Sequence, residues 1–157
     1  MAEQLIKQIA TDELSILLIP VNGKQLILPN VSVAEIVSYS EPKKVEEGPG
    51  WLKGWVDWRA QTVPLFSFEE INQEAMPASS ASRRIVILNG IIDSSKLPFC
   101  AIISDGVPRA MRIRPREIAS LDDDDKGIAE LTSVVVNGEH AIIPNMDWLQ
   151  QQLIAVL

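Results

Sequence analysis

Short apolar runs separated by turn residues follow one another along most of the chain. Residues 14–19 and 25–28 form two such runs, and the dipeptide Asn22-Gly23 between them favours a two-residue type I′ turn. A second Asn-Gly pair, residues 137–138, lies between two further apolar runs. Runs of this length, with frequent glycine, proline and asparagine between them, are typical of small β domains. The pattern therefore predicts an all-β fold, mainly hairpins with short helices.

The same order of strand, turn and proline occurs twice. Aligning Pro64 with Pro144, an offset of 80 residues, also places Phe68 over Trp148. A duplicated pattern predicts a duplicated structure, here two small β barrels or paired sheets. Residues after Pro144 suit an amphipathic helix packed on a barrel, and residues 4–9 suit a short helix or a frayed arm. We expect one domain over residues 1–157, with approximate parts at 14–70 (first barrel), 83–143 (second barrel) and 144–157 (C-terminal helix).

The chain of 157 residues is acidic, with 14 Lys+Arg against 21 Asp+Glu and a net charge of -7. Non-specific binding to nucleic acid or anionic membrane depends on a basic surface, so neither is expected as a partner. The longest charge-free apolar stretches are about half the roughly 20 residues that a spanning helix needs, so no direct membrane insertion is expected. The first dozen residues carry no secretory signal, and the single cysteine is typical of a reducing compartment. We expect a cytoplasmic protein.

Candidate chemistry is sparse, since the chain offers one cysteine, Cys100, and one histidine, His140. Each lies in an apolar run, where a cysteine is usually a small buried hydrophobe and a lone histidine a satisfied interior partner. A structural zinc site needs about four such ligands. The acidic run 122–125 departs from a calcium loop because Lys126 occupies a ligand position. We expect no catalysis, no metal and no cofactor, with a Cys100 enzyme as a rival that thiol reactivity would test.

Packing in a hydrophobic core does not by itself explain two groups of residues. Alternation along residues 51–58 predicts tryptophan on both faces of one strand. Exposed tryptophan near arginine is typical of interfaces, and a core or inter-barrel role is equally open. Arg112, Arg114 and Arg116 alternate, which predicts one strand face suited to acidic partner groups, with a solubilising edge as the alternative.

Residues 31–68 resemble the CheW-like domain of bacterial chemosensory systems. The resemblance rests on Val33-Ala34-Glu35-Ile36, the approach ending in Gly48-Pro49, the segment Trp51–Ala60, and Val63-Pro64-Leu65. It implies two SH3-like five-stranded β-barrels around a shared hydrophobic core. It also implies an adaptor without catalysis.

The resemblance further implies partners. Members of the family join the cytoplasmic tips of chemoreceptors to the regulatory domain of a CheA-type histidine kinase. A role in chemotaxis or pilus-based motility, with recruitment to membrane-associated receptor arrays, is therefore expected. The partner-binding residues carried over to this chain are Val33, Glu35, Ile36, Gly54, Trp58 and Arg59. Apart from the resemblance, the alternating arginines suggest a second contact at Arg112, Arg114 and Arg116. Glu35 and Arg59 could form a charge-assisted hydrogen bond that orients the surface. The alternative function is a β-barrel module that binds single-stranded nucleic acid or another protein partner.

The chain departs from the family pattern at two positions. Ala60 replaces the glycine of the turn, and alanine tolerates a positive φ poorly. Ser67 stands where the family usually has an aspartate. These departures predict a divergent or accessory member, and they point toward a pilus-motility type of pathway.

Overall fold

The computed structural model describes residues 13–121 and 125–157, and in this part the chain forms two β sheets. The six-stranded sheet A has the order β8-β1-β2-β11-β10-β9, and the five-stranded sheet B has the order β3-β6-β7-β5-β4. Sheet A consists of β1 (Leu14–Val21), β2 (Lys24–Pro29), β8 (Arg109–Ile113), β9 (Ile118–Leu121), β10 (Glu130–Val136) and β11 (Glu139–Pro144). Sheet B consists of β3 (Val33–Ser38), β4 (Leu52–Trp58), β5 (Gln61–Phe66), β6 (Arg84–Asn89) and β7 (Phe99–Ser104). The helices are η1 (Asn30–Ser32), α2 (Phe68–Ile71), η2 (Pro115–Glu117) and α3 (Met146–Val156).

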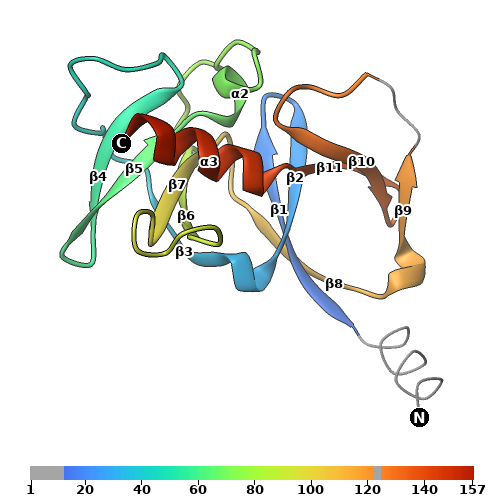
Figure 1. Ribbon diagram of the computed structural model, residues 1–157. Helices are drawn as coiled ribbons and strands as arrows, with labels where there is room; N and C mark the ends of the chain where they lie inside the picture. The colour runs from blue at the N-terminus through green and yellow to red at the C-terminus, as the bar shows by residue number, and fades with distance from the viewer. Residues whose placement is uncertain (1–12, 122–124) are drawn as a thin grey trace.

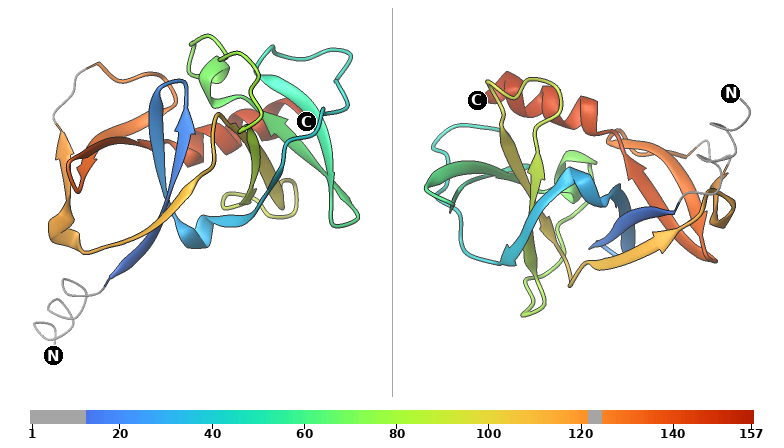
Figure 2. Two further views of the ribbon diagram at one scale, coloured as in Figure 1. Left: turned by 180° about the vertical axis from the view of Figure 1, so that it is seen from behind. Right: turned by 90° about the horizontal axis from the view of Figure 1, so that it is seen from below.

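The two sheets form two lobes that lie side by side, with α3 across them (Figure 1). Figure 2 shows the same lobes from behind and from below. The predicted mainly β fold with a C-terminal helix is confirmed, although sheet A has six strands where five were expected. The arm at residues 4–9, and residues 122–124 of the acidic run, lie outside the described residues.

The strand β1 is apolar along most of its length because both of its faces are buried. Ile16 and Leu18 belong to a cluster within sheet A, whereas Leu17 and Ile19 belong to a central cluster to which both sheets contribute. The strands β6 and β7 alternate in the same way between a cluster within sheet B and the central cluster. The shared hydrophobic core is therefore confirmed, and it explains why these strands read as continuous apolar runs.

The two predicted Asn-Gly turns are confirmed. Asn22 and Gly23 have φ values of 39° and 72°, and Asn137 and Gly138 have φ values of 47° and 80°. Positive φ at both central residues defines the type I′ turn, which matches the twist of the flanking strands. Each turn joins an antiparallel pair, β1–β2 or β10–β11.

The division between the lobes does not follow the order of the sequence. The predicted halves at 14–70 and 83–143 are wrong, because sheet B takes residues 33–104 while sheet A takes β1–β2 together with β8–β11. The hairpin β1–β2 pairs with β8 and, through the parallel register pair Leu26–Ile142, with β11. A local apolar pattern shows that a strand is buried, but it does not specify which distant strand becomes its neighbour.

The predicted repeat is present at a slightly different register. The hairpins β4–β5 and β10–β11 each close around a two-residue turn, preceded by Trp58 in one and Val136 in the other. Their offset is 78 residues rather than 80, and a shift of two residues leaves every side chain on the same face. In each sheet the second strand of this hairpin then lies parallel to a strand of another hairpin, β5 beside β7 and β11 beside β2.

The helix α3 follows sheet A but packs against sheet B. Asn145 caps it, since the backbone N–H of Trp148 donates to Asn145 Oδ1 at 3.2 Å. Gln150 is fully buried, donates to the carbonyl oxygen of Asn89 (3.1 Å) and accepts from the backbone N–H of Ile91 (2.8 Å). The helix thus ties the two lobes together. Within the described residues, no helix is long and apolar enough to cross a membrane.

Candidate partner-binding site

One carboxylate oxygen links the two edge strands of sheet B. Glu35 lies on β3, while Trp58 ends β4 and Arg59 begins the turn to β5. Glu35 Oε1 accepts hydrogen bonds from Arg59 Nη2 (2.8 Å), Arg59 Nε (3.2 Å) and Trp58 Nε1 (3.3 Å). The predicted pairing of Glu35 with Arg59 is confirmed, and it joins β3 to the tip of the β4–β5 hairpin across the open side of the barrel.

Aromatic rings support this cluster from the interior. The guanidinium carbon of Arg59 lies 5.0 Å from the ring centroid of Trp58, a cation–π contact. The Trp58 ring meets the Phe99 ring edge-on, with 4.8 Å between centroids. Trp58 is only 9% exposed, whereas the Arg59 side chain is 69% exposed. A buried platform therefore holds an outward-facing guanidinium in a defined position.

The turn that carries Arg59 keeps the type I′ conformation without glycine. Arg59 and Ala60 have φ values of 48° and 61°. Ala60, where the family motif has glycine, therefore adopts the left-handed conformation that glycine favours, at the cost of a left-handed alanine. Ser67, the other departure, is buried at the N-terminus of α2, where its hydroxyl accepts from the backbone N–H of Glu70 (3.1 Å). Serine thus caps this helix in place of aspartate.

The remaining motif residues occupy different environments. Ile36 is 38% exposed on β3, beside Glu35 in the sequence. Val33 is half-buried and packs against the central cluster. Gly54 is buried with a φ of 133°, and a Cβ there would lie 2.1 Å from the carbonyl oxygen of Lys43. Gly54 thus lets the chain at Lys43 approach β4, and its part in partner binding stays a prediction.

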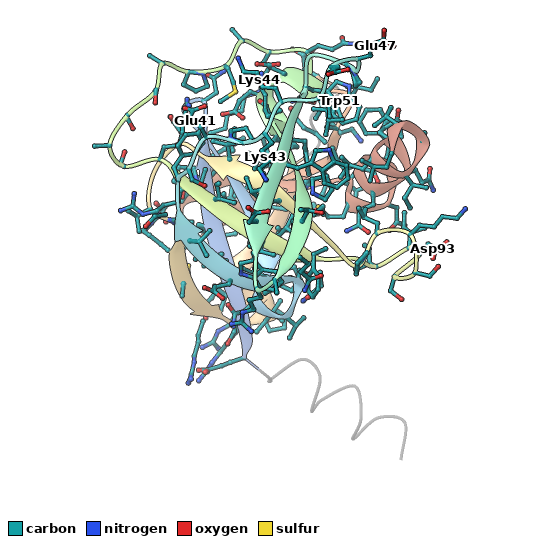
Figure 3. All side chains as sticks on the ribbon, turned by 90° about the vertical axis from the view of Figure 1, so that its left-hand side faces the viewer. Glu41, Lys43, Lys44, Glu47, Trp51 and Asp93 are labelled. Atoms are coloured by element: carbon teal, nitrogen blue, oxygen red, sulfur yellow. The ribbon has the colours of Figure 1, made fainter. Side chains whose placement is uncertain are left out.

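The tryptophan-bearing strand alternates as predicted. Leu52, Gly54, Val56 and Trp58 are buried, while the residues between them are half-buried or exposed. Trp55 and Lys43 exchange two backbone hydrogen bonds of 2.9 Å, so the segment before β4 runs along its edge. Figure 3 shows Lys43 in front of β4 and Trp51 toward α3, and Trp51 packs against the central cluster. Of the tryptophans in and before this strand, Trp58 is buried, whereas Trp51 and Trp55 are half-buried.

The arginine strip is not one strand face. Arg112 lies on β8, Arg114 precedes η2 and Arg116 lies within η2. Pro115 ends the strand because it lacks a backbone donor, and the chain then turns into the 3-10 helix. All three side chains are exposed, and Arg114 Nη2 lies 3.8 Å from Glu13 Oε1. The arginines therefore gather at a corner of sheet A rather than along one strand.

Cys100 and His140 lie on different sheets and do not form a dyad. Cys100, on β7, is fully buried, and burial raises the pKa of its thiol to about 12. A thiol with such a pKa stays protonated and is a poor nucleophile at neutral pH. His140, on β11, is exposed, which corrects the expectation of an interior histidine. Across residues 13–121 and 125–157, no group of three or more His, Cys, Asp or Glu residues is arranged to hold a metal ion.

The sequence matches the family model of the CheW-like domain over residues 15–153. The chain belongs to the CheW-like domain family. The fold agrees with the crystal structure of the scaffolding protein TtCheW from Thermoanaerobacter tengcongensis, with a TM-score of 0.72 and 17% sequence identity over 85% of this chain and 89% of that chain. A comparison with curated proteins finds no match.

The two lobes are accordingly the two SH3-like subdomains of the CheW fold. CheW-like domains are non-catalytic, in agreement with the expectation that this chain is not an enzyme. Sequence reasoning identified Glu35, Trp58 and Arg59, but it missed Phe99, which supports Trp58 from β7. No local signal marks Phe99, because the contact arises only when β3, β4 and β7 close into one barrel.

Proposed function

We propose that this CheW-like chain is a non-catalytic adaptor that couples chemoreceptors to a CheA-type histidine kinase in a chemotaxis or pilus-motility pathway. The observation that carries the proposal is the cluster of Glu35, Trp58 and Arg59, in which three donors converge on one carboxylate oxygen. An exposed ion pair contributes only about 0 to 1 kcal/mol to stability. Its use is therefore to orient a contact surface rather than to hold the fold.

The cluster presents both charge and apolar area to the receptor. Arg59 supplies a fixed cation, and Ile36 on the adjacent edge strand supplies an exposed apolar side chain. A helical receptor tip that offers a carboxylate next to apolar residues would match this combination. Preorganisation of Arg59 by Trp58 and Glu35 reduces the entropy lost when the contact forms.

A second surface lies on the other lobe. Arg112 and Arg116 are exposed at the corner of sheet A, in a chain whose net charge is -7. We assign this corner to an acidic surface of the kinase regulatory domain, because guanidinium groups pair with carboxylates in bidentate geometry. Two weak contacts on two lobes raise the overall affinity within an array by linkage.

The test is a titration of the purified chain against receptor tips and, separately, against the regulatory domain of a CheA-type kinase from the same organism. Arg59→Glu should weaken receptor binding at least tenfold, because it reverses the charge that Trp58 and Glu35 hold in place. Lys43→Glu is the matched control, since Lys43 is also exposed and undergoes the same charge change. The double variant Arg112→Glu/Arg116→Glu should weaken kinase binding instead.

Binding to both partners would establish the coupling role. Binding to the kinase alone would identify an accessory or competing adaptor, and binding to neither would contradict the proposal. An Arg59→Glu chain that folds normally and binds both partners as before would remove Arg59 from the site.

A further inference from the structure

Arg83 is a buried cation that forms no ion pair in the described part of the chain. It lies just before β6, is 7% exposed, and its guanidinium is 5.4 Å from the Tyr39 ring centroid. Its Nη2 donates to the carbonyl oxygen of Pro77 (2.9 Å), while its Nε is buried with no hydrogen-bond partner in the described part of the chain. Among those residues, Arg83 forms no ion pair within 4.0 Å. A buried charge left in this way is costly, so the position calls for an anion.

The neighbouring acid on α2 does not form an ion pair with Arg83 within 4.0 Å. Glu69, on α2, is 1% exposed, and burial raises the pKa of its carboxyl. The attraction of Arg83 opposes this rise but does not reverse it. The attraction between the two groups acts through space, and it leaves the buried Nε of Arg83 without a hydrogen-bond partner in the described part of the chain.

A pocket of about 310 Å³ opens beside Arg83 at the end of sheet B. Its apolar wall includes Tyr39, Met76 and Ile103. Its charged lining comprises three cations and two carboxylates, namely Lys44, Lys53, Arg83, Glu41 and Glu70. Lys53 and Glu70 pair with each other, whereas Lys44 has no ion pair among the described residues. The lining is thus locally cationic in an acidic protein.

We propose that this Arg83 pocket binds a carboxylate on a short apolar stem, the acidic side chain of a partner protein. Arg83 and Lys44 would donate to the carboxylate, and the apolar wall would cover the stem. The volume lies at the lower limit of small-molecule pockets, which suits one side chain and not a nucleotide.

The pocket is separate from the cluster that contains Arg59. In Figure 1, α2 and the loop before β4 lie at the top of the sheet B lobe, while the β4–β5 turn lies at its bottom. Figure 3 shows Glu41 and Lys44 together above Lys43. The Arg83 pocket is therefore a further contact that does not depend on the proposed receptor or kinase surfaces.

The test follows the Arg83 Nε–H signal of the ¹⁵N-labelled full chain by NMR. The probes are N-acetylglutamate methylamide and N-acetylglutamine methylamide, which share a shape and differ in charge. The glutamate compound should shift the signal saturably with a millimolar Kd, at least tenfold tighter than the glutamine compound. Inorganic phosphate lacks the stem and should bind more weakly, and tighter phosphate binding would overturn the assignment to a side chain.

Two variants distinguish binding in the Arg83 pocket from a general effect of surface charge. Lys44→Gln should weaken binding of the glutamate probe about fivefold. Lys43→Gln, at the next residue, should leave it unchanged, because the Lys43 side chain is 79% exposed and lies 3.9 Å from Asp57. Equal binding of the two amides, no saturable shift, or equal effects of the two lysine variants would each contradict the proposal. Because no receptor or kinase is used, the result is independent of the proposed function.

Discussion

At the scale of single residues, the turn at Arg59 shows how a departure from a family pattern can be absorbed. Ala60 occupies the left-handed region that favours glycine, with a φ of 61°. The conformation persists because the strands on either side are paired from Leu52 to Phe66 and because Glu35 holds Arg59. The strain at Ala60 is therefore borne by the pairing around it.

Replacing Ala60 with glycine should consequently stabilise the protein. We expect Ala60→Gly to raise the free energy of unfolding by about 1 kcal/mol, because a left-handed alanine costs about that much relative to glycine. Urea denaturation followed by circular dichroism measures the change. Gly138→Ala is the matched variant in the equivalent turn of sheet A, where φ is 80°, and it should destabilise by a similar amount. Destabilisation by Ala60→Gly would contradict this view of the turn.

The residues of the site were only partly predictable. Opposite charges within the family motif were enough to predict that Glu35 and Arg59 meet. The same motif gave no way to tell that the chain at Lys43 approaches β4 closely at Gly54. The pairing depends on two side chains, whereas the approach depends on how distant backbone segments pack, which a local sequence does not show.

At the scale of elements, the short helix α2 places a carboxyl where water cannot reach it. Glu69 is 1% exposed, and burial raises its pKa while hydrogen bonds from its own backbone and from Ser67 lower it. The folded protein therefore binds a proton at Glu69 more tightly than the unfolded chain does. Stability contributed by this group is present below the unfolded pKa and is lost as pH rises through the folded pKa.

Replacing Glu69 with a side chain that does not ionise should remove this loss of stability at higher pH. Glu69→Gln should increase stability at pH 7 relative to the parent chain, and the difference should shrink toward zero below the ordinary glutamate pKa. Chemical denaturation at a series of pH values measures it. Glu70→Gln is the control at the next position, where the side chain pairs with Lys53 at the surface, and it should give no gain at pH 7. A parent and a Glu69→Gln variant with the same pH profile would contradict the prediction.

Hairpins and their turns could be predicted from the sequence, whereas their assembly could not. An Asn-Gly pair between apolar runs specifies a type I′ turn through local backbone preference alone. The choice of β11 as the parallel neighbour of β2 depends on packing between segments far apart in the chain. The arginines at the end of β8 were predicted to share one strand face because the alternation of residues was continued through Pro115, where the strand has already ended.

At the scale of the whole molecule, the central cluster makes the lobes depend on each other. It draws on β1 and β2 from sheet A, on β6 and β7 from sheet B, and on α3. A polar network adds to it where Asn72 accepts from the backbone N–H of Ala129 (2.9 Å) and donates to Glu130 Oε2 (2.7 Å). Neither lobe keeps a complete core if the other unfolds.

Unfolding should therefore be a single transition. The four tryptophans lie in or beside β4 and in α3, so their fluorescence reports on sheet B and α3, while far-ultraviolet circular dichroism reports on both sheets. We expect the two denaturation curves to coincide. A fluorescence transition that precedes or follows the circular dichroism transition would show that the lobes unfold separately.

The split of sheet A between the two ends of the chain also fixes an order of events during synthesis. The hairpin β1–β2 leaves the ribosome before the other strands, yet β8 begins 80 residues after β2 ends. At about 5–20 residues per second, this hairpin waits roughly 4–16 s for β8, the next strand of its own sheet. The residues made in that interval are those of sheet B, which can cover one apolar face of β1 through the central cluster. Because the sequence of sheet B lies between β2 and β8, the residues made next can cover the hairpin and protect it from aggregation until β8 is made.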